Sequence, residues 1–428
     1  MRQEWRKHIV RVVLGALIFS FFILGTGAGP DSVALQEPYP QLKILNNVIF
    51  LIQNNYVEKV DLKELIQGAI KGMLQTLDPH SSYLTPEQYS DMKVDTRGSF
   101  EGVGIEITVK DYQLTVVAPI EGTPAEKAGI LPGDRIIKID GQVTKDMTLH
   151  DAVSKMRGPR GSQVTLTILR GESQTPQDFI LVREVIRVKS VRTKDLEEGI
   201  GYIRIASFQE KTSEDLQKAL GERYEKGLKG LILDLRSNPG GLLDQAIQVS
   251  DQFLEKGKLV VYTQGRTEEK HEYFARSGQK KNIRFPMVVM INGGSASASE
   301  IVAGALQDWK RAVVLGTPSF GKASVQTIIE LEDHSALRLT TARYFTPLGK
   351  AIQGKGISPD ILVEVPKVET EAGKKPARPK EAEQKGLEPK ISEDEGVGPE
   401  EMSRKEADVA KDFQLQRALE ILKAHRML

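Results

Sequence analysis

The alternation of strand-like and helix-like segments after Gly199 constrains the fold most strongly. Short apolar runs alternate there with longer amphipathic segments. Continuous apolar strands separated by helical segments are typical of an α/β domain with a buried sheet. The expected strands are 200–206, 231–235, 287–291 and 313–315, and the expected helices are 213–226, 242–254 and 298–307.

The remainder of the chain has a different pattern in each segment. Residues 41–77 predict two helices, the second with Asp61 and Glu64 at capping-box spacing, and residues 99–184 show short β runs with Gly/Pro turns. A last amphipathic helix near residues 415–422 either pairs with a second subunit or packs on its own core. The predicted division is 1–30 signal peptide or signal-anchor, 38–95 helical region, 96–185 inserted β-domain, 186–365 α/β core, 366–406 charged linker and 407–428 C-terminal helix.

Composition excludes several classes of function. A length of 428 residues predicts about three structural units. The formal charge of +1 gives no general surface for polyanions, so we expect no nucleic-acid partner. The chain has no cysteine, which excludes disulfides, thiolate zinc sites and a cysteine nucleophile. We expect no metal and no cofactor.

The N-terminus predicts export. Four basic residues lie at or before Arg11, an apolar run covers 12–24, and small residues follow at 25–29. This is the signal-peptide pattern, with Ala28 as a cleavage point. The run extended to 9–28 approaches the ~20 residues that span a bilayer, so an uncleaved anchor is equally compatible. Either alternative places the remainder in the periplasm or on the extracytoplasmic face of the inner membrane, with membrane contact through this segment.

The β-rich segment carries a peptide-binding pattern. The run Gly-Thr-Pro-Ala-Glu-Lys-Ala-Gly-Ile-Leu-Pro-Gly-Asp-Arg-Ile at 122–136 resembles the signature of PDZ domains. In that family a carboxylate-binding loop stands where this chain has Gly102, Val103, Gly104 and Ile105. Glycines let successive N–H groups converge on an anion, and an adjacent strand can pair with an extended peptide. We therefore expect binding of free C-termini, although the glycines by themselves would also suit a β-bulge.

A cluster of serines follows the expected strand 287–291. Ser295, Ser297 and Ser299 alternate with alanines where a helix begins. N–H groups and the positive end of a helix suit a developing oxyanion, so one of these serines is a candidate nucleophile. The Ser297–Glu300 spacing also fits a capping box, which would make Ser297 a helix cap. Ser295 could cap instead and leave Ser297 free.

A base for that serine is not provided by a recognisable histidine motif. Lys322 lies between the strand 313–315 and the β-branched run 325–329. As a base, its pKa must fall from about 10.4 toward 7–8, which burial beside a neutral neighbour favours. Gln326, on the same face of a strand that begins near Lys322, could hold the amine without adding charge. The alternative is an ordinary solvated loop lysine.

A glycine-containing turn is the third candidate segment. Asp-Leu-Arg-Ser-Asn-Pro-Gly-Gly at 234–241 stands between an expected strand and an expected helix. Consecutive glycines there permit close approach of a substrate to N–H donors. A plain strand-to-helix turn would have the same sequence features.

These segments, together with Asp-Pro-His-Ser-Ser-Tyr-Leu at 78–84, resemble the C-terminal processing peptidases over about residues 40–365. The resemblance implies a multidomain α/β protein with a Clp-protease/crotonase-like core and a PDZ domain inserted before it. It implies peptide or protein substrates with free C-termini, and leaves open an adaptor protein and a homo-oligomer. The implied roles are Ser297 as nucleophile, Lys322 as general base, Gln326 as the residue that orients the lysine, and the N–H groups of Ala298 and of Gly240 or Gly241 as the oxyanion hole.

Two features qualify this resemblance. Ala323 stands where the family usually has glycine. In some members an arginine of the PDZ domain contacts the catalytic Lys/Gln pair when peptide binds, and Arg157, which precedes Gly158, is the expected counterpart here, with Arg160 as the alternative.

Two alternative functions have some support in the sequence. Residues 316–322 match the first seven positions of a phosphate-binding P-loop, but Ala323 replaces the magnesium-binding Ser/Thr and a strand-like run follows, which excludes nucleotide hydrolysis. The second alternative is an inactive PDZ scaffold of the cell envelope; the presence of Ser297, Lys322 and Gln326 argues against it.

Overall fold

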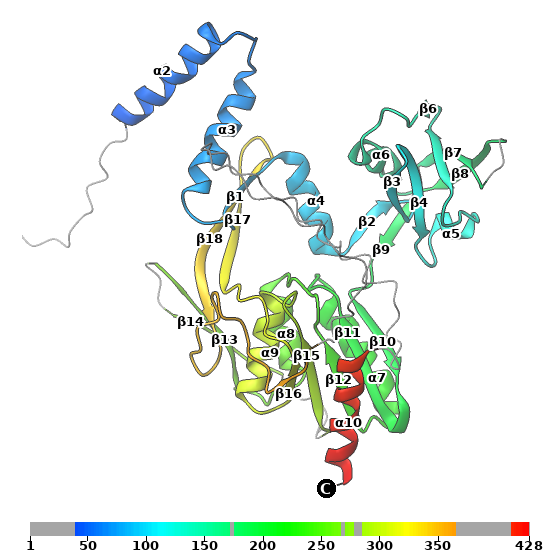
Figure 1. Cartoon of the computed structure of the whole chain (residues 1–428), viewed down its shortest axis with the longest axis vertical. Helices are drawn as coiled ribbons and strands as arrows, with labels where there is room; N and C mark the ends of the chain where they lie inside the picture. Colours follow the sequence, from blue (N-terminus) through cyan, green and yellow to red (C-terminus); the bar gives the residue numbers. More distant parts are fainter. Residues whose placement is uncertain (1–38, 172–174, 267–269, 278–284, 365–411, 428) are drawn as a thin grey trace, which may run out of the picture. The chain divides into compact units, whose positions relative to one another are not determined.

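The computed structural model describes residues 39–171, 175–266, 270–277, 285–364 and 412–427 (Figure 1). The predicted export segment 1–30 and the predicted linker 366–406 lie outside these residues. Among the described helices, none combines the length and apolar character needed to span a membrane. The chain divides into two units, residues 1–73 and 74–428.

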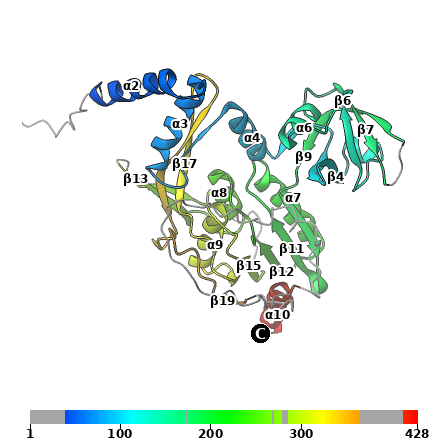
Figure 2. The same cartoon turned by 45° about the horizontal axis from the view of Figure 1, so that its top comes forward.

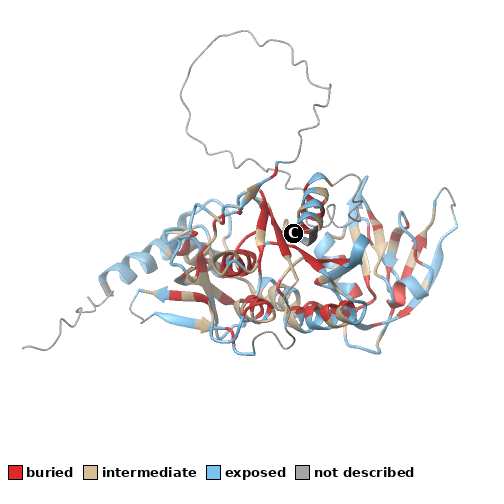
Figure 3. Ribbon diagram, turned by 90° about the horizontal axis from the view of Figure 1, so that it is seen from below, coloured by how far each residue is buried: buried red, intermediate tan, exposed pale blue. Residues whose placement is uncertain are grey.

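The first unit contains the helix α2 (Tyr39–Asn55) and all but the last two residues of α3 (Leu62–Gln75). Asp61 caps α3, because its carboxylate accepts the Lys63 N–H at 2.8 Å. The apolar side chains of α2 recur at helical spacing as predicted, yet none of its described side chains is buried (Figure 3). Its large exposed apolar residues are Leu42, Ile44, Leu45, Val48, Phe50 and Leu51.

The core of the second unit is the predicted α/β sheet. Its six strands are, in spatial order, β10 (Val191–Asp195), β11 (Ile200–Ile205), β12 (Gly230–Asp234), β15 (Met287–Ile291), β16 (Val313–Gly316) and β19 (Ile361–Leu362). All neighbours are parallel except β10 and β11. The inner strands β12, β15 and β16 are nearly continuous apolar runs, as expected where both faces of a sheet are covered, whereas the edge strand β10 is mostly exposed.

Helices cover the two faces unequally. On one face, Leu231 and Leu233 of β12 join a large core with α7 (Thr212–Glu225), α8 (Leu243–Asp251) and α9 (Ala298–Asp308). On the other face, Ile232 joins a smaller core with α10 (Phe413–Met427). Figure 2 shows α10 next to β12 of this sheet. The buried residues of α10 in that core are Leu415, Ala418, Leu419 and Leu422. Of the two alternatives for the last helix, the structure therefore shows packing on the chain's own sheet.

A second, antiparallel sheet lies beside this core. It contains, in spatial order, β1 (Ser82–Leu84), β18 (Ala336–Phe345), β13 (Leu259–Gly265) and β14 (His271–Phe274), and β17 (Ser324–Glu330) also pairs with β18. The sequence indicated only β17 as β-like. The register of β17 against β18 shifts between Val325 and Gln326, so strict alternation along β17 is broken where Gln326 lies.

The predicted β-rich segment forms a separate sheet with its own core. Its strands are, in spatial order, β3 (Ile105–Lys110), β4 (Gln113–Pro119), β5 (Arg135–Ile139), β7 (Gln163–Leu169) and β8 (Gln177–Val182), with β6 (Gln142–Val143) paired to β5. Strand β3 is an edge strand, which leaves one side open for pairing. The remaining elements are α4 (Pro86–Arg97), α5 (Pro124–Lys127), α6 (Leu149–Met156), the pair β2 (Ser99–Gly102) and β9 (Glu184–Arg187), and the 3-10 helix η1 (Glu197–Gly199).

Candidate active site

The three serines of the cluster occupy different environments. Ser295 is buried, and its hydroxyl donates to the Leu235 carbonyl at 2.8 Å. Ser299 is also buried and donates to the Asn238 carbonyl at 2.9 Å. Ser297 alone of the three is partly exposed. The structure therefore gives Ser295 and Ser299 internal hydrogen bonds and leaves Ser297 accessible.

Ser297 begins α9 in an unusual backbone conformation. It occupies the N-cap position with φ of 54° and ψ of −115°. Residues other than glycine seldom adopt such angles. A residue held in this conformation costs about 1–3 kcal/mol, and such residues cluster at functional sites. A strained strand-to-helix turn of this kind presents a nucleophile at the end of a sheet. The capping alternative holds in part, since Glu300 accepts the Ser297 N–H at 2.8 Å.

Glu300 connects the serine to the lysine. Its side chain is fully buried. The Glu300 Oε2 atom accepts the N–H of Ser297 at 2.8 Å and the N–H of Lys322 at 3.0 Å. The Glu300 Oε1 atom accepts the Ser319 hydroxyl at 2.6 Å and the Gly321 N–H at 2.7 Å. One buried side chain thus fixes the backbones of both candidate catalytic residues.

Tyr344 of β18 supports the same bridge. Its hydroxyl lies 3.1 Å from the Ser297 carbonyl oxygen and 3.3 Å from Glu300 Oε2, and it also bonds the Lys322 carbonyl oxygen. Burial, with a further contribution from Glu300, raises the pKa of Tyr344 well above its ordinary value, so the phenol stays protonated and can donate. No sequence pattern indicates Tyr344, and the Ser297–Glu300 spacing predicts Glu300 only as a helix-capping residue.

The amine of Lys322 lies in an environment that favours its neutral form. Partial burial lowers its pKa, and the positive charge of Arg338 lowers it further. Asp78 and Glu300 act in the opposite direction, but the net pKa is below the ordinary value for lysine. Ala323, the residue that departs from the family pattern, is not among the described residues with positive φ, so its methyl group causes no backbone strain.

Gln326 faces the lysine. Lys322 Nζ lies 3.5 Å from Gln326 Oε1, and Gln326 Nε2 donates to the His80 carbonyl oxygen at 2.8 Å. The bond to His80 fixes which end of the amide points toward the amine. Asp78 holds that loop, because its carboxylate accepts the N–H groups of His80 and Ser81 at 2.7 and 2.8 Å.

The two glycines of the 234–241 turn have different neighbours: Gly240 lies against the serine loop, and Gly241 lies against the backbone of Phe208. A Cβ atom added to Gly240 would come within 2.8 Å of Ser297 Cβ and 3.0 Å of Ala298 N. The Gly240 N–H donates to Asn238 Oδ1 at 2.9 Å. Among the described residues, no acceptor contacts the N–H of Gly241 or of Ala298. One unpaired donor, the Ala298 N–H, therefore directly follows the partly exposed serine, and the other belongs to the turn that packs against it through Gly240.

In the β-rich domain, the expected carboxylate-binding loop connects β2 to β3. Gly104 has φ of +78°, and an added Cβ would come within 2.4 Å of Thr123. Val103 is buried and its carbonyl accepts the Ala125 N–H at 3.0 Å, while Gly102 ends β2 and Ile105 begins β3. Within the described part of the chain, no acceptor contacts the N–H of Val103 or Gly104.

In the structure, Arg157 contacts α4 and β2. Its guanidinium donates to Asp91 Oδ1 of α4 at 2.9 Å and lies 5.2 Å from the ring centre of Phe100. Arg160 is exposed, and its N–H donates to Glu101 at 3.2 Å. Contact of either arginine with Lys322 after peptide binding stays a prediction.

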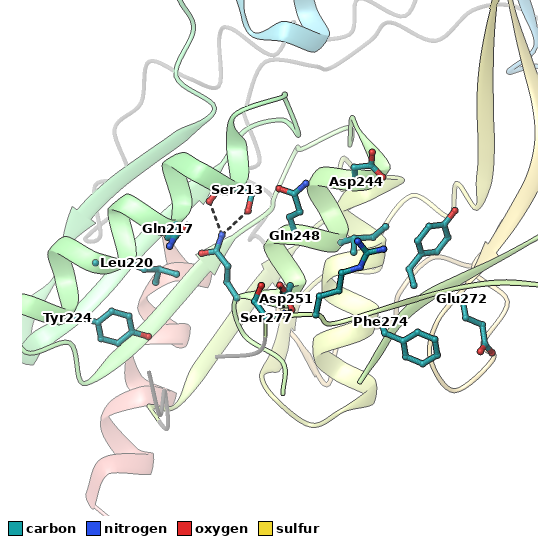
Figure 4. A pocket seen from close by; sticks show the side chains of 15 residues that line it. Ser213, Gln217, Leu220, Tyr224, Asp244, Gln248, Asp251, Glu272, Phe274 and Ser277 are labelled. Atoms are coloured by element: carbon teal, nitrogen blue, oxygen red, sulfur yellow. Dashed lines mark hydrogen bonds between the residues drawn. The ribbon is translucent and has the colours of Figure 1, made fainter. Parts of the chain in front are cut away.

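A separate hollow of about 790 Å³ lies between α7, α8 and β14 (Figure 4). Its lining includes Leu220, Tyr224 and Phe274, and Gln252 closes one side by donating to Ser213. None of the candidate catalytic residues lines it.

Three family models match the chain. Peptidase family S41 matches residues 199–363, the PDZ domain matches residues 115–170, and the activating protease CtpB N-terminal domain matches residues 30–88. The matches cover the α/β core, the β-rich sheet and the N-terminal helices in turn.

Relatives along most of the chain agree with these matches. A carboxy-terminal-processing protease of Bartonella bacilliformis is 52% identical over 336 residues, 77% of this chain and 77% of that protein. The carboxy-terminal processing protease CtpA of Bacillus subtilis is 38% identical over 359 residues, 84% of this chain and 76% of that protein. A solved photosystem II D1 C-terminal processing protease is 30% identical with a TM-score of 0.45, covering 76% of this chain and 88% of that one. The first of these relatives is 52% identical over 77% of this chain. The chain therefore belongs to the carboxy-terminal processing proteases, which are serine-type enzymes of peptidase family S41 with a PDZ domain.

Proposed function

We propose that this protein is an exported endopeptidase that captures the C-terminus of a protein substrate with its PDZ domain and cleaves the chain through Ser297, Lys322 and Gln326. The bridge through Glu300 carries the proposal. Because the N–H groups of Ser297 and Lys322 donate to the same buried oxygen, the hydroxyl and the amine start from backbones held side by side.

The proposed reaction is acyl transfer. Neutral Lys322 takes the Ser297 proton as the serine oxygen attacks the scissile carbonyl, and the resulting ammonium then protonates the leaving amine. Water, deprotonated by Lys322, hydrolyses the acyl-enzyme. Gln326 presents a carbonyl oxygen to the amine, so it orients Lys322 without adding a charge that would stabilise the ammonium form.

For the oxyanion hole we propose the N–H groups of Ala298 and Gly241. The Gly240 carbonyl accepts the Phe208 N–H at 2.8 Å. In a trans peptide the N–H of the next residue points the opposite way, so the Gly241 N–H points away from Phe208. The Gly240 N–H is already bonded to Asn238, which favours Gly241 as the donor.

Substrate capture is proposed at the loop before β3. The unpaired N–H groups of Val103 and Gly104 suit a carboxylate, and the free edge of β3 suits an added peptide strand. The basic and apolar pattern of residues 1–30 supports export, with this segment as the membrane contact. The exposed apolar residues of α2 suit a second copy of the chain or an adaptor.

A cleavage assay on a peptide with an apolar, free C-terminus tests the proposal. We expect wild type to fragment this peptide, the same peptide amidated at its C-terminus to be cleaved more slowly, and Ser297→Ala to bind the peptide without cleaving it. Mass spectrometry identifies the fragments. Binding without cleavage by wild type would instead favour the PDZ scaffold, and equal cleavage of both peptides would remove C-terminal capture.

The charge of Arg338, in addition to burial, should lower the pH at which the enzyme becomes active. Only neutral Lys322 is active, so kcat/KM should rise with pH through one ionisation below the ordinary lysine value. Arg338→Gln removes a positive charge that lowers the pKa of Lys322, so the rise should move to higher pH. Arg343→Gln, an exposed change on the same strand, is the matched control and should leave the profile in place. A rise at the same pH in Arg338→Gln would contradict this assignment.

A further inference from the structure

The turn that carries the two glycines is held at its start by an arginine that also holds the C-terminal helix. The side chain of Arg236 is only 12% exposed. Its guanidinium donates to the two oxygens of Asp412 at 2.9 and 2.6 Å, and to Gln414 Oε1 at 3.0 Å. Asp412 immediately precedes α10 and Gln414 lies in its first turn. The contact therefore joins the turn at residues 234–241 to a segment that lies 176 residues away in sequence.

The same guanidinium is bonded to a buried carboxylate of the sheet. Asp234, at the end of β12, is fully buried, and it accepts Arg236 Nη2 at 2.7 Å and the Tyr202 hydroxyl at 2.7 Å. Burial opposes the charge of Asp234, but Arg236, Arg204 and Tyr202 outweigh it and keep its pKa below the ordinary value. A planar guanidinium can bond two carboxylates at once in fixed geometry, which a lysine ammonium cannot reproduce.

The turn after Arg236 is bonded to the serine loop. The Asn238 carbonyl accepts the Ala296 N–H at 3.0 Å, and Asn238 Oδ1 accepts the Gly240 N–H at 2.9 Å. Asn238 Nδ2 donates to the Ile205 carbonyl at 2.8 Å. A displacement of Arg236 would therefore move Asn238, two residues further along the chain. The hydrogen bonds of Asn238 would pass this movement to Gly240 and to Ala296 in the loop that carries the nucleophile.

We propose that Asp412 is a positioning residue for catalysis. By fixing Arg236, the docked C-terminal helix holds the turn so that the Gly241 N–H faces the scissile carbonyl. This inference rests on the proposed serine–lysine mechanism, and it makes α10 part of the framework of the active site in addition to a cover for the sheet.

A second contact of α10 provides the matched control. Lys423 bonds Glu197 at 2.6 Å, which ties the helix to η1, the 3-10 helix before β11. Lys423→Ala removes an ion pair between α10 and the core without touching the turn after β12. If α10 only covers apolar surface, Lys423→Ala and Asp412→Asn should affect the enzyme alike.

Steady-state kinetics test the proposal. Asp412→Asn keeps the side-chain shape and removes the charge through which α10 holds Arg236, while the bonds of Arg236 to Asp234 remain. Loss of one oxyanion donor costs about 10²–10³ in kcat, and a displaced donor should cost less, so we expect kcat to fall about tenfold with KM nearly unchanged. Lys423→Ala should keep the wild-type kcat. An equal fall of kcat in both variants, or none in Asp412→Asn, would overturn the proposal.

Hydrogen exchange gives a readout that needs no catalysis. In the Ser297→Ala background, Asp412→Asn should speed exchange of the Gly240 and Ala296 amides, both bonded to Asn238, and Lys423→Ala should not. Unchanged exchange at these amides would contradict the positioning role even if activity fell. Failure of the proposed function appears differently, as cleavage by Ser297→Ala itself at the wild-type rate.

Discussion

Replacing Lys322 with alanine should lower kcat/KM roughly 10⁴-fold at neutral pH, because the hydroxyl of Ser297 then has no base. Lys322→Arg should be equally inactive, since a guanidinium stays protonated at any working pH. Binding of a peptide with a free C-terminus should survive in both variants, because the N–H groups proposed to bind it belong to Val103 and Gly104. Cleavage of a labelled peptide and fluorescence anisotropy measure the two quantities separately.

Lys218→Ala is the control for this prediction. Lys218 is exposed on α7, so Lys218→Ala removes the same type of side chain without changing the candidate site. We expect wild-type activity from this variant. Wild-type cleavage by Lys322→Ala at neutral pH would remove the lysine from the mechanism, and loss of peptide binding in the same variant would show that the change had disturbed the fold.

The central sheet could be predicted because buried parallel strands have a simple sequence pattern. Runs such as Met287–Ile291 are apolar at every position, and they stand between amphipathic segments of helical length. The partner strand β18 was missed because its sequence, Ala-Leu-Arg-Leu-Thr-Thr-Ala-Arg-Tyr-Phe, mixes apolar, hydroxyl and basic residues along a half-exposed surface. That mixture fits an edge of a sheet as well as a loop.

Helix α4 was missed for a different reason. Its sequence is polar, so apolar periodicity gives no signal. The helix depends on its ends: Thr85 and Gln88 form a capping box, Pro86 occupies the first turn, and Gly98 ends the helix with φ of 67°. These signals were present in the sequence, and a search for caps rather than for apolar spacing would have found them.

The candidate site was predictable where it depends on local sequence. Ser297 and Lys322 stand beside strands and small residues, and both patterns can be seen within ten residues. The bridge between them was not predictable, because Ser-x-x-Glu has the same spacing whether Glu300 caps a helix or also receives the Lys322 N–H. Tyr344 lies 47 residues from Ser297 in sequence, and nothing in its surroundings indicates that contact.

Replacing Glu300 with glutamine should disturb the site in two opposing ways. Glu300 raises the pKa of Lys322, so loss of its charge should shift the pH–rate profile to lower pH and favour activity at neutral pH. The amide, however, offers only one acceptor oxygen where two oxygens now receive donors, from Ser319 and Gly321 on one and from Ser297 and Lys322 on the other.

Whichever way the glutamine amide turns, at least two of these donors meet an NH₂ group that cannot accept. Each buried donor left unpaired costs about 1–3 kcal/mol. We expect the backbone of Ser297 or Lys322 to shift so that these donors find other acceptors. A shift of about 1 Å can cost 10²-fold in rate, whereas a pKa change of one unit alters the neutral fraction of lysine at most about tenfold. Misplacement should therefore dominate, so the high-pH plateau of kcat/KM falls about 10²-fold while the midpoint moves to lower pH.

The plateau and the midpoint of the pH–rate profile separate these two effects. Glu222→Gln, an exposed change on α7, is the matched control and should alter neither. If Glu300→Gln kept the wild-type plateau and moved only the midpoint, Glu300 would act through its charge alone and the shared bridge would not position Ser297 and Lys322. A lower plateau with peptide binding intact would instead mean that the buried carboxylate contributes by positioning Ser297 and Lys322 relative to each other. The charge of Glu300 by itself disfavours the neutral amine, so it cannot account for the contribution.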